Sequence, residues 1–80
     1  MFYCYILRCS DNTLYTGYTN DLDKRLKAHN SGNGAKYTKF RRPCVMVYYE
    51  SYDNKHDAMS REYYVKHCMS RADKLKLIEK

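Results

Sequence analysis

Arg25 and Glu62 are charged side chains at helical positions where apolar residues are expected. On a helical wheel of about 100° per residue, Arg25 lies about 60° from the apolar stripe of Leu22 and Leu26, at the seam with a sheet. Glu62 falls about 40° from Ala58, within the apolar stripe of a second helix. A guanidinium can hold phosphate oxygens and a carboxylate can bind a divalent cation, so the pair allows phosphate chemistry. The alternatives are an arginine stem that snorkels over the core and a structural ion pair between the two side chains.

His29 also falls inside the apolar stripe of the first helix, at about −20° on the same wheel. An imidazole at this position could contact a phosphate or assist proton transfer. A core histidine with satisfied hydrogen bonds is the alternative, and the sequence leaves both roles open.

Tyr5 and Tyr15 are expected on one face of a β-hairpin. With the SDN turn at residues 10–12 as the loop, Leu7 should face Tyr15 and Tyr5 should face Gly17. The two tyrosines then lie about 7 Å apart as diagonal neighbours, and Gly17 leaves open space beside the Tyr5 ring. A four-residue loop would place the rings on opposite faces, so the inference depends on register. In a chain with 10 tyrosines, plain packing is the alternative.

A basic and aromatic loop follows the first predicted helix. Cations interleaved with rings suit contact with phosphates and an exposed base. The predicted nucleic-acid-binding residues are Lys36, Tyr37, Lys39, Arg41 and Arg42. We recognise no base-reading element in the sequence, so structure-dependent or weakly specific binding is expected. A solvated loop with its rings packed beneath it fits the pattern equally well.

The first half of the chain must supply a hairpin and a helix to position these groups. Alternating apolar residues predict strands over residues 2–9 and 13–19. Asn20 is the expected N-cap of a helix over residues 21–29, which the NSGNG segment ends. The basic loop that follows has room for one helical turn.

The second half reads as one strand and two helices. A third strand is expected over residues 44–52 and a long helix over residues 54–68. Ser70 and Asp73 form a capping box that should open a short final helix running through Lys80. The order β-β-α-β-α-α predicts a single α+β domain over residues 1–80, in which helices pack on a three-stranded antiparallel-type sheet.

Composition narrows the partners and the compartment. The chain has 15 Lys and Arg against 9 Asp and Glu, a net charge of +6, which favours an anionic partner such as nucleic acid. We find no apolar run near the ~20 residues of a spanning helix and no signal peptide, so a cytoplasmic protein without membrane contact is expected. The cysteines lack zinc-site spacing, and buried reduced thiols are expected at Cys4, Cys9, Cys44 and Cys68.

Taken in order, these residues resemble the GIY-YIG nuclease domain. CYI at residues 4–6 and YTG at residues 15–17 match the paired signatures, with Arg25 downstream and Glu62 on a later helix. The resemblance covers nearly the whole chain and indicates a small stand-alone bacterial member with the GIY-YIG endonuclease fold. GAKYT at residues 34–38, together with His29, is also similar to the catalytic subunit of eukaryotic structure-specific endonucleases, which needs a larger partner.

The resemblance implies a metal-dependent endonuclease that hydrolyses phosphodiester bonds, with structure-selective DNA cleavage in repair or recombination. Glu62 would bind a single Mg²⁺ or Mn²⁺, and Arg25 would hold phosphate oxygens in the transition state. One of Tyr5 and Tyr15 would deprotonate water, helped by nearby positive charge that favours the phenolate, and the other would position water or contact phosphate. His29 completes the implied catalytic set.

The implied partner is nucleic acid, with DNA expected ahead of RNA, bound by a monomer or together with a protein partner that supplies specificity. The alternative is a nucleic-acid-binding module that has no turnover or is active only with a partner, because 80 residues leave no separate DNA-binding domain. Three positions depart from the family pattern. Cys4 replaces a glycine, Thr16 replaces an isoleucine, and Tyr18 stands where nucleotide-excision-repair relatives carry a lysine, which removes one cationic contact.

Overall fold

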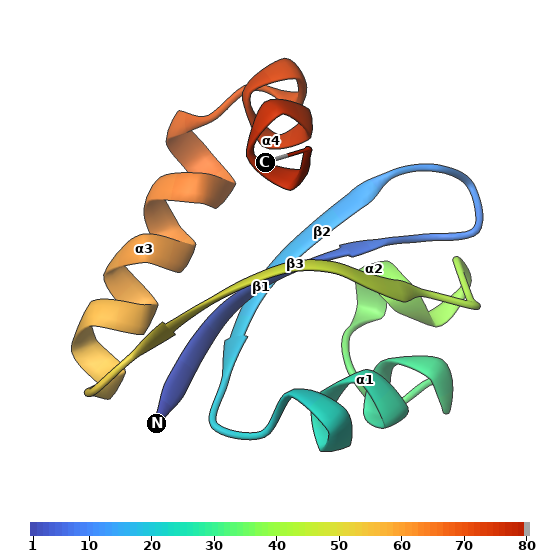
Figure 1. The fold of residues 1–80 in the computed structure, drawn as a ribbon. Coiled ribbons are helices and arrows are strands. Elements are labelled where there is room, and N and C mark those ends of the chain that lie inside the picture. Colours follow the sequence, from blue (N-terminus) through green and yellow to red (C-terminus); the bar gives the residue numbers. More distant parts are fainter. Residues whose placement is uncertain (80) are drawn as a thin grey trace.

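The computed structural model describes residues 1–79 and places a three-stranded sheet between two pairs of helices (Figure 1). The strand order is β2-β1-β3, and both strand pairs are antiparallel. The strands are β1 (Phe2–Arg8), β2 (Leu14–Thr19) and β3 (Val45–Tyr52). The predicted α+β class, element order and antiparallel sheet are therefore confirmed.

The helices begin and end within a few residues of their predicted bounds. They are α1 (Leu22–Asn30), α2 (Lys36–Lys39), α3 (Lys55–Cys68) and α4 (Arg71–Ile78). Asp21 rather than Asn20 caps α1, because its carboxylate accepts a hydrogen bond from the Lys24 amide at 3.0 Å. The capping box of α4 is present as predicted, but the helix ends at Ile78 with Glu79 as its C-cap, so the predicted continuation is wrong at Glu79, and Lys80 lies outside the described residues. None of the helices within residues 1–79 is both long and apolar enough to cross a bilayer.

The side chains of β1 alternate between two cores. Tyr5 and Leu7 pack on one face, which α1 covers, whereas Cys4 and Ile6 pack against Val65 of α3 on the other. Figure 1 shows α1 and α3 on opposite sides of the sheet. Burial on both faces explains why the strand is almost continuously apolar.

Three of the four cysteine thiols are buried in these cores, and one is exposed. Cys4, Cys9 and Cys44 are buried, as predicted, whereas Cys68 is exposed. The prediction is wrong for Cys68 because this residue closes the last turn of α3 on its solvent side.

Glu50 forms a polar cluster between β3 and α3 that the sequence analysis missed. Its carboxylate accepts hydrogen bonds from the hydroxyls of Tyr48 and Tyr52, and Arg61 donates two more at 2.9 and 3.2 Å. Burial alone would raise the pKa of Glu50, but the hydrogen bonds from Arg61 and the tyrosines outweigh it and lower that pKa. The cluster therefore fastens the long helix to an edge strand.

Arg61→Met is expected to lower the free energy of unfolding by about 1–3 kcal/mol at pH 7, because it leaves the Glu50 carboxylate without its charged partner. The two side chains are 30% and 20% exposed, which keeps the cost below that of a fully buried pair. A lowered folded-state pKa means that the wild-type gain is present above about pH 4.5 and disappears as the pH falls. Urea denaturation tests this, with the exposed Lys76→Met as the control, and equal stability of the two variants at pH 7 would contradict it.

Candidate active site

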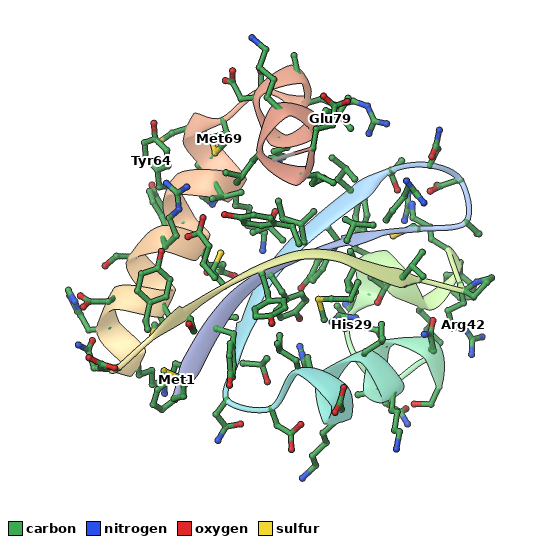
Figure 2. The ribbon with its side chains drawn as sticks, in the orientation of Figure 1. Met1, His29, Arg42, Tyr64, Met69 and Glu79 are labelled. Carbon is green, nitrogen blue, oxygen red and sulfur yellow. The ribbon has the colours of Figure 1, made fainter. Side chains whose placement is uncertain are left out.

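Three predicted site residues meet on the face of the sheet that α1 covers. The Tyr5 hydroxyl lies 2.8 Å from Nε2 of His29, and Nε of Arg25 donates a hydrogen bond to the same hydroxyl at 3.3 Å. Tyr5 and His29 are both 0% exposed. Figure 2 labels His29 between α1 and the sheet. The polar residues that interrupt the apolar stripe of α1 are thus bonded to the tyrosine of β1.

The predicted hairpin register is confirmed and makes room for the Tyr5 ring. Leu7 pairs with Tyr15, and Tyr5 pairs with Gly17. A Cβ atom at Gly17 would lie 2.5 Å from the Tyr5 hydroxyl oxygen and 2.6 Å from its Cζ. Only glycine leaves the space that this ring occupies.

Gly17→Ala is expected to destabilise the protein by about 1–3 kcal/mol, because the new methyl group overlaps a buried ring that is bonded to His29 and Arg25. The displaced Tyr5 hydroxyl should also lose both hydrogen bonds. Thermal melts and the Tyr5 ring signals in an NMR spectrum measure the two effects. Ser51→Ala, at an exposed position of β3, is the control. Unchanged melting and ring signals in the glycine variant would contradict the tight packing.

Arg25 is held at two points, which answers the alternatives left open by the sequence. Besides Tyr5, its guanidinium donates from Nη2 to the Gly34 carbonyl at 3.0 Å. Glu62 pairs instead with Lys66, one helical turn further along α3, at 3.7 Å. Within residues 1–79, Arg25 and Glu62 therefore do not form the core ion pair. The hydrogen bond to Tyr5 raises the pKa of Arg25, so the guanidinium stays charged.

Tyr15 connects this cluster to α3. Its ring lies 5.2 Å from the His29 ring and stacks on the Tyr37 ring at 5.8 Å. The Lys66 ammonium lies 5.3 Å from the centroid of the Tyr15 ring, and the same ammonium pairs with Glu62. The half-buried Tyr15 thus stands between the buried Tyr5–His29 pair and the carboxylate of α3.

Burial determines the protonation of Tyr5 and His29. It raises the pKa of Tyr5 to about 12, and the hydrogen bond and charge of Arg25 only partly offset that rise. Burial and the Arg25 charge lower the pKa of His29 to about 4. The positive charge of Arg25 acts on Tyr5 in the expected direction, but burial outweighs it, so at neutral pH a neutral phenol meets a neutral imidazole.

Glu62 has the chemistry of a ligand for a hard divalent cation. Its carboxylate is 21% exposed and pairs with the Lys66 ammonium at 3.7 Å, which solvent also reaches. Within residues 1–79, no group of three or more His, Cys, Asp or Glu side chains could hold a metal ion. The residues present fit a site in which Glu62 supplies one oxygen and water or substrate supplies the others, as Mg²⁺ commonly accepts.

The predicted nucleic-acid-binding loop contains α2 and presents most of its predicted contacts to solvent. The exposed members are Lys36, Tyr37, Lys39 and Arg42. Arg41 is only half-buried and acts within the fold, because it donates to Asp11 at 3.0 Å and stacks 4.1 Å above the Tyr37 ring. The loop thus combines exposed cations, of which Arg42 donates to the Lys39 carbonyl at 2.8 Å, with an arginine that ties the loop to the hairpin turn.

Two residues of the site were missed by sequence reasoning. Thr38 is completely buried, and its Oγ1 lies 2.8 Å from Nδ1 of His29. Gly34 packs so closely on His29 that a Cβ atom there would overlap the imidazole ring. Both lie in the GAKYT segment at residues 34–38 that resembles a nuclease subunit, but their spacing follows no helical or strand period, so periodicity did not indicate that either residue contacts His29.

An open hollow of about 500 Å³ borders Arg25 at the N-terminal end of α1. It is lined by Phe2, Tyr18, Thr19, Asn20, Arg25 and Lys55. Lys55, from the first turn of α3, brings a second cation to the space that Tyr18 lines. The walls contain no acidic side chain, so the hollow suits an anionic group.

The comparisons with known proteins agree with this architecture. The model of the GIY-YIG catalytic domain matches residues 1–75. A UPF0213 protein from Pediococcus pentosaceus is 57% identical over 79 residues, which is 99% of this chain and 82% of that protein. A UPF0213 protein from Clostridium perfringens is 58% identical over 78 residues, 98% of this chain and 83% of that one.

A solved structure shows the same fold. The solution NMR structure of a UPF0213 protein from Bacillus halodurans has a TM-score of 0.62 and 49% identity, and the match covers 99% of this chain and 84% of that one. The family match extends over nearly the whole chain and includes every site residue described above. The chain therefore belongs to the GIY-YIG catalytic domain family, alongside the small UPF0213 proteins.

Proposed function

We propose that this protein is a metal-dependent endonuclease that hydrolyses phosphodiester bonds in nucleic acid. The observation that carries the proposal is that two hydrogen bonds fix the guanidinium of Arg25 beside an open hollow. Its Nε and Nη2 are held by Tyr5 and Gly34, while the residue also lines an open hollow without acidic walls. Arg25 is thus a planar cation held in a fixed orientation at the border of an open hollow, which suits it to bind a phosphate.

Glu62 would hold the Mg²⁺ or Mn²⁺ ion. When bound, such an ion stabilises charge on a phosphoryl oxygen and lowers the pKa of a bound water. The protein's own contribution is to keep Arg25 beside the phosphate and to bring Glu62 to the same edge of the sheet through α3. The Lys66–Tyr15 contact at 5.3 Å supports this placement.

The two tyrosines have different roles in the proposal. Tyr5 is buried and its proton is directed at His29, so it holds Arg25 in place instead of meeting solvent. Tyr15 is half-buried, so solvent can reach it, and its ring lies 5.3 Å from the Lys66 ammonium that pairs with Glu62. We therefore assign Tyr15 the task of deprotonating or positioning the attacking water.

The substrate would lie across the hollow and the α2 loop. Lys55 and Arg25 offer cations at one end, and Lys36 and Lys39 offer them at the other. Phe40, which is 85% exposed, could stack on an unpaired base, whereas Tyr15 and Arg41 already pack on the Tyr37 ring. Contacts to phosphates and to unpaired bases suit recognition of branched or single-stranded structure. We therefore propose structure-selective cleavage, with DNA expected as the substrate ahead of RNA.

A cleavage screen tests the proposal. Purified protein with Mg²⁺ or Mn²⁺ is expected to cut at least one of a panel of flaps, junctions, nicked duplexes and single strands, and EDTA should stop the reaction. Glu62→Ala should lose cleavage with little change in melting temperature, because the exposed pair with Lys66 is worth only about 0.3–0.5 kcal/mol. Asp53→Ala, which removes an exposed carboxylate just before α3, is the control. No cleavage by the wild type of any panel member would refute the proposal.

A binding module without turnover is the second candidate. The protonated, buried state of Tyr5 favours it, since that tyrosine cannot act as a base as it stands. It predicts salt-dependent binding of DNA that is unchanged in a Tyr5→Phe, Glu62→Ala double variant, with no cleavage by either protein. Titrations at several salt concentrations therefore separate the two candidates.

A further inference from the structure

A continuous chain of hydrogen bonds links the α2 loop to Arg25 through the buried centre. Thr38 Oγ1 donates to the Ala35 carbonyl at 3.2 Å and lies 2.8 Å from Nδ1 of His29. On the other side of the imidazole, Nε2 lies 2.8 Å from the Tyr5 hydroxyl, which accepts a hydrogen bond from Nε of Arg25 at 3.3 Å. Thr38, His29 and Tyr5 are each 0% exposed, so water cannot substitute for a missing partner in this conformation.

Counting protons along this chain leaves one consistent assignment. A guanidinium only donates, so the Tyr5 oxygen accepts from Arg25 and its own proton must go to His29 Nε2. Thr38 has one hydroxyl proton, which it donates in a hydrogen bond to the Ala35 carbonyl. The Thr38 oxygen therefore accepts a hydrogen bond from His29 Nδ1. A neutral imidazole with one proton, on Nδ1, satisfies both conditions.

The opposite tautomer would break the chain at both ends. With the proton on Nε2, the Tyr5 oxygen would face two donors and its own proton would have no acceptor among these groups. Thr38 would have to turn its proton from Ala35 to Nδ1. A buried donor or acceptor without a partner is costly, so the threonine hydroxyl selects the tautomer.

We propose that Thr38 is a positioning residue that holds His29 in the Nδ1–H tautomer. In this tautomer the Tyr5 hydroxyl donates its proton to His29, away from the substrate, and its oxygen accepts the hydrogen bond from Arg25. The tautomer follows from the structure alone, whereas the effect on cleavage rests on the proposed nuclease function.

The segment that carries Thr38 contacts each part of the proposed centre. The Gly34 carbonyl accepts from Arg25, the Tyr37 ring stacks on Tyr15, and Thr38 faces His29. The same segment, residues 34–38, also presents the exposed Lys36 to solvent. The element proposed to meet the nucleic acid is thus the element that orients the proposed catalytic side chains.

Long-range ¹H–¹⁵N NMR of protein labelled at histidine nitrogen tests the tautomer without reference to activity. At pH 7 we expect His29 to show the Nδ1–H pattern, and the His29→Asn spectrum identifies its signals among those of His56 and His67. Thr38→Ser should keep the pattern, whereas Thr38→Val should lose it or mix the tautomers. An Nε2–H pattern in the wild type would overturn the proposal even if the valine variant does not fold, and so would an unchanged pattern in a folded Thr38→Val.

The kinetic arm tests the consequence for cleavage. If the wild type cleaves nucleic acid, Thr38→Val should lower kcat about tenfold with KM nearly unchanged, and Thr38→Ser should restore most of the rate. An Nδ1–H wild type whose valine variant keeps full kcat would overturn the positioning role. Absence of wild-type cleavage would refute the nuclease function alone, because the NMR outcome still decides the tautomer.

Discussion

Arg25→Lys is expected to reduce single-turnover cleavage about 10²- to 10³-fold, the usual cost of losing one donor aimed at developing negative charge. The guanidinium uses Nε for Tyr5 and Nη2 for Gly34, and a single ammonium cannot bond to both and also meet a phosphate. Charge is preserved in this variant, so the loss would report the geometry of the fork.

The measurement compares rates at saturating protein, with melting temperature as the check on folding. Lys24→Ala removes an exposed cation from the neighbouring position of the same helix and should cleave at the wild-type rate. Because Tyr5 and Gly34 lose their donors, the free energy of unfolding of Arg25→Lys should be lower by roughly 1 kcal/mol, and its melting temperature should fall slightly. If Arg25→Lys cleaved at the wild-type rate, the guanidinium would not act as a planar clamp, and only the positive charge at this position would matter.

The hairpin and the seam position of Arg25 could be predicted from the sequence because both depend on short-range periodicity. The three-residue turn set the register, and the register placed Gly17 beside Tyr5. The helical wheel placed Arg25 at the edge of the apolar stripe, where it donates to Tyr5 in the structure. Each inference needed only the pattern of one or two neighbouring elements.

Thr38, Gly34 and Glu50 could not be predicted because their roles depend on tertiary paths. Thr38 and Gly34 lie on a loop whose return to α1 has no period, yet both contact His29. Glu50 looks like an ordinary polar residue of an edge strand until α3 brings Arg61 against it. Buried polar groups of this kind are found by asking where each hydrogen bond goes, which requires the folded chain.

The difference between Tyr5 and Tyr15 likewise depends on the fold. In the sequence, each tyrosine is half of a paired signature, and nothing separates their roles. In the structure, the central strand buries Tyr5 completely, while the edge strand leaves Tyr15 half-buried beside Lys66. Position in the sheet order thus separates a tyrosine that positions Arg25 from one that can meet water.

The free energy of unfolding is expected to fall by about 2 kcal/mol between pH 7 and pH 5 because of His29 alone. Its pKa is lowered from 6.5 to about 4 in the folded protein, so the unfolded chain binds a proton first as the pH drops. The stabilisation is therefore complete above about pH 6.5 and is lost as the pH falls toward 4. Stopping at pH 5 avoids most of the contribution from the Glu50 carboxylate, which is lost at lower pH.

Urea denaturation at half-unit steps from pH 5 to pH 7 measures this slope. His29→Asn should flatten it, because asparagine has no proton to gain, whereas His56→Asn should not, because His56 is exposed on the first turn of α3. The wild-type curve is decisive even if His29→Asn is too unstable to study. A wild type whose stability is constant over this range would mean that the folded protein accepts a charged His29, and a charged imidazole has no acceptor nitrogen for the Tyr5 proton.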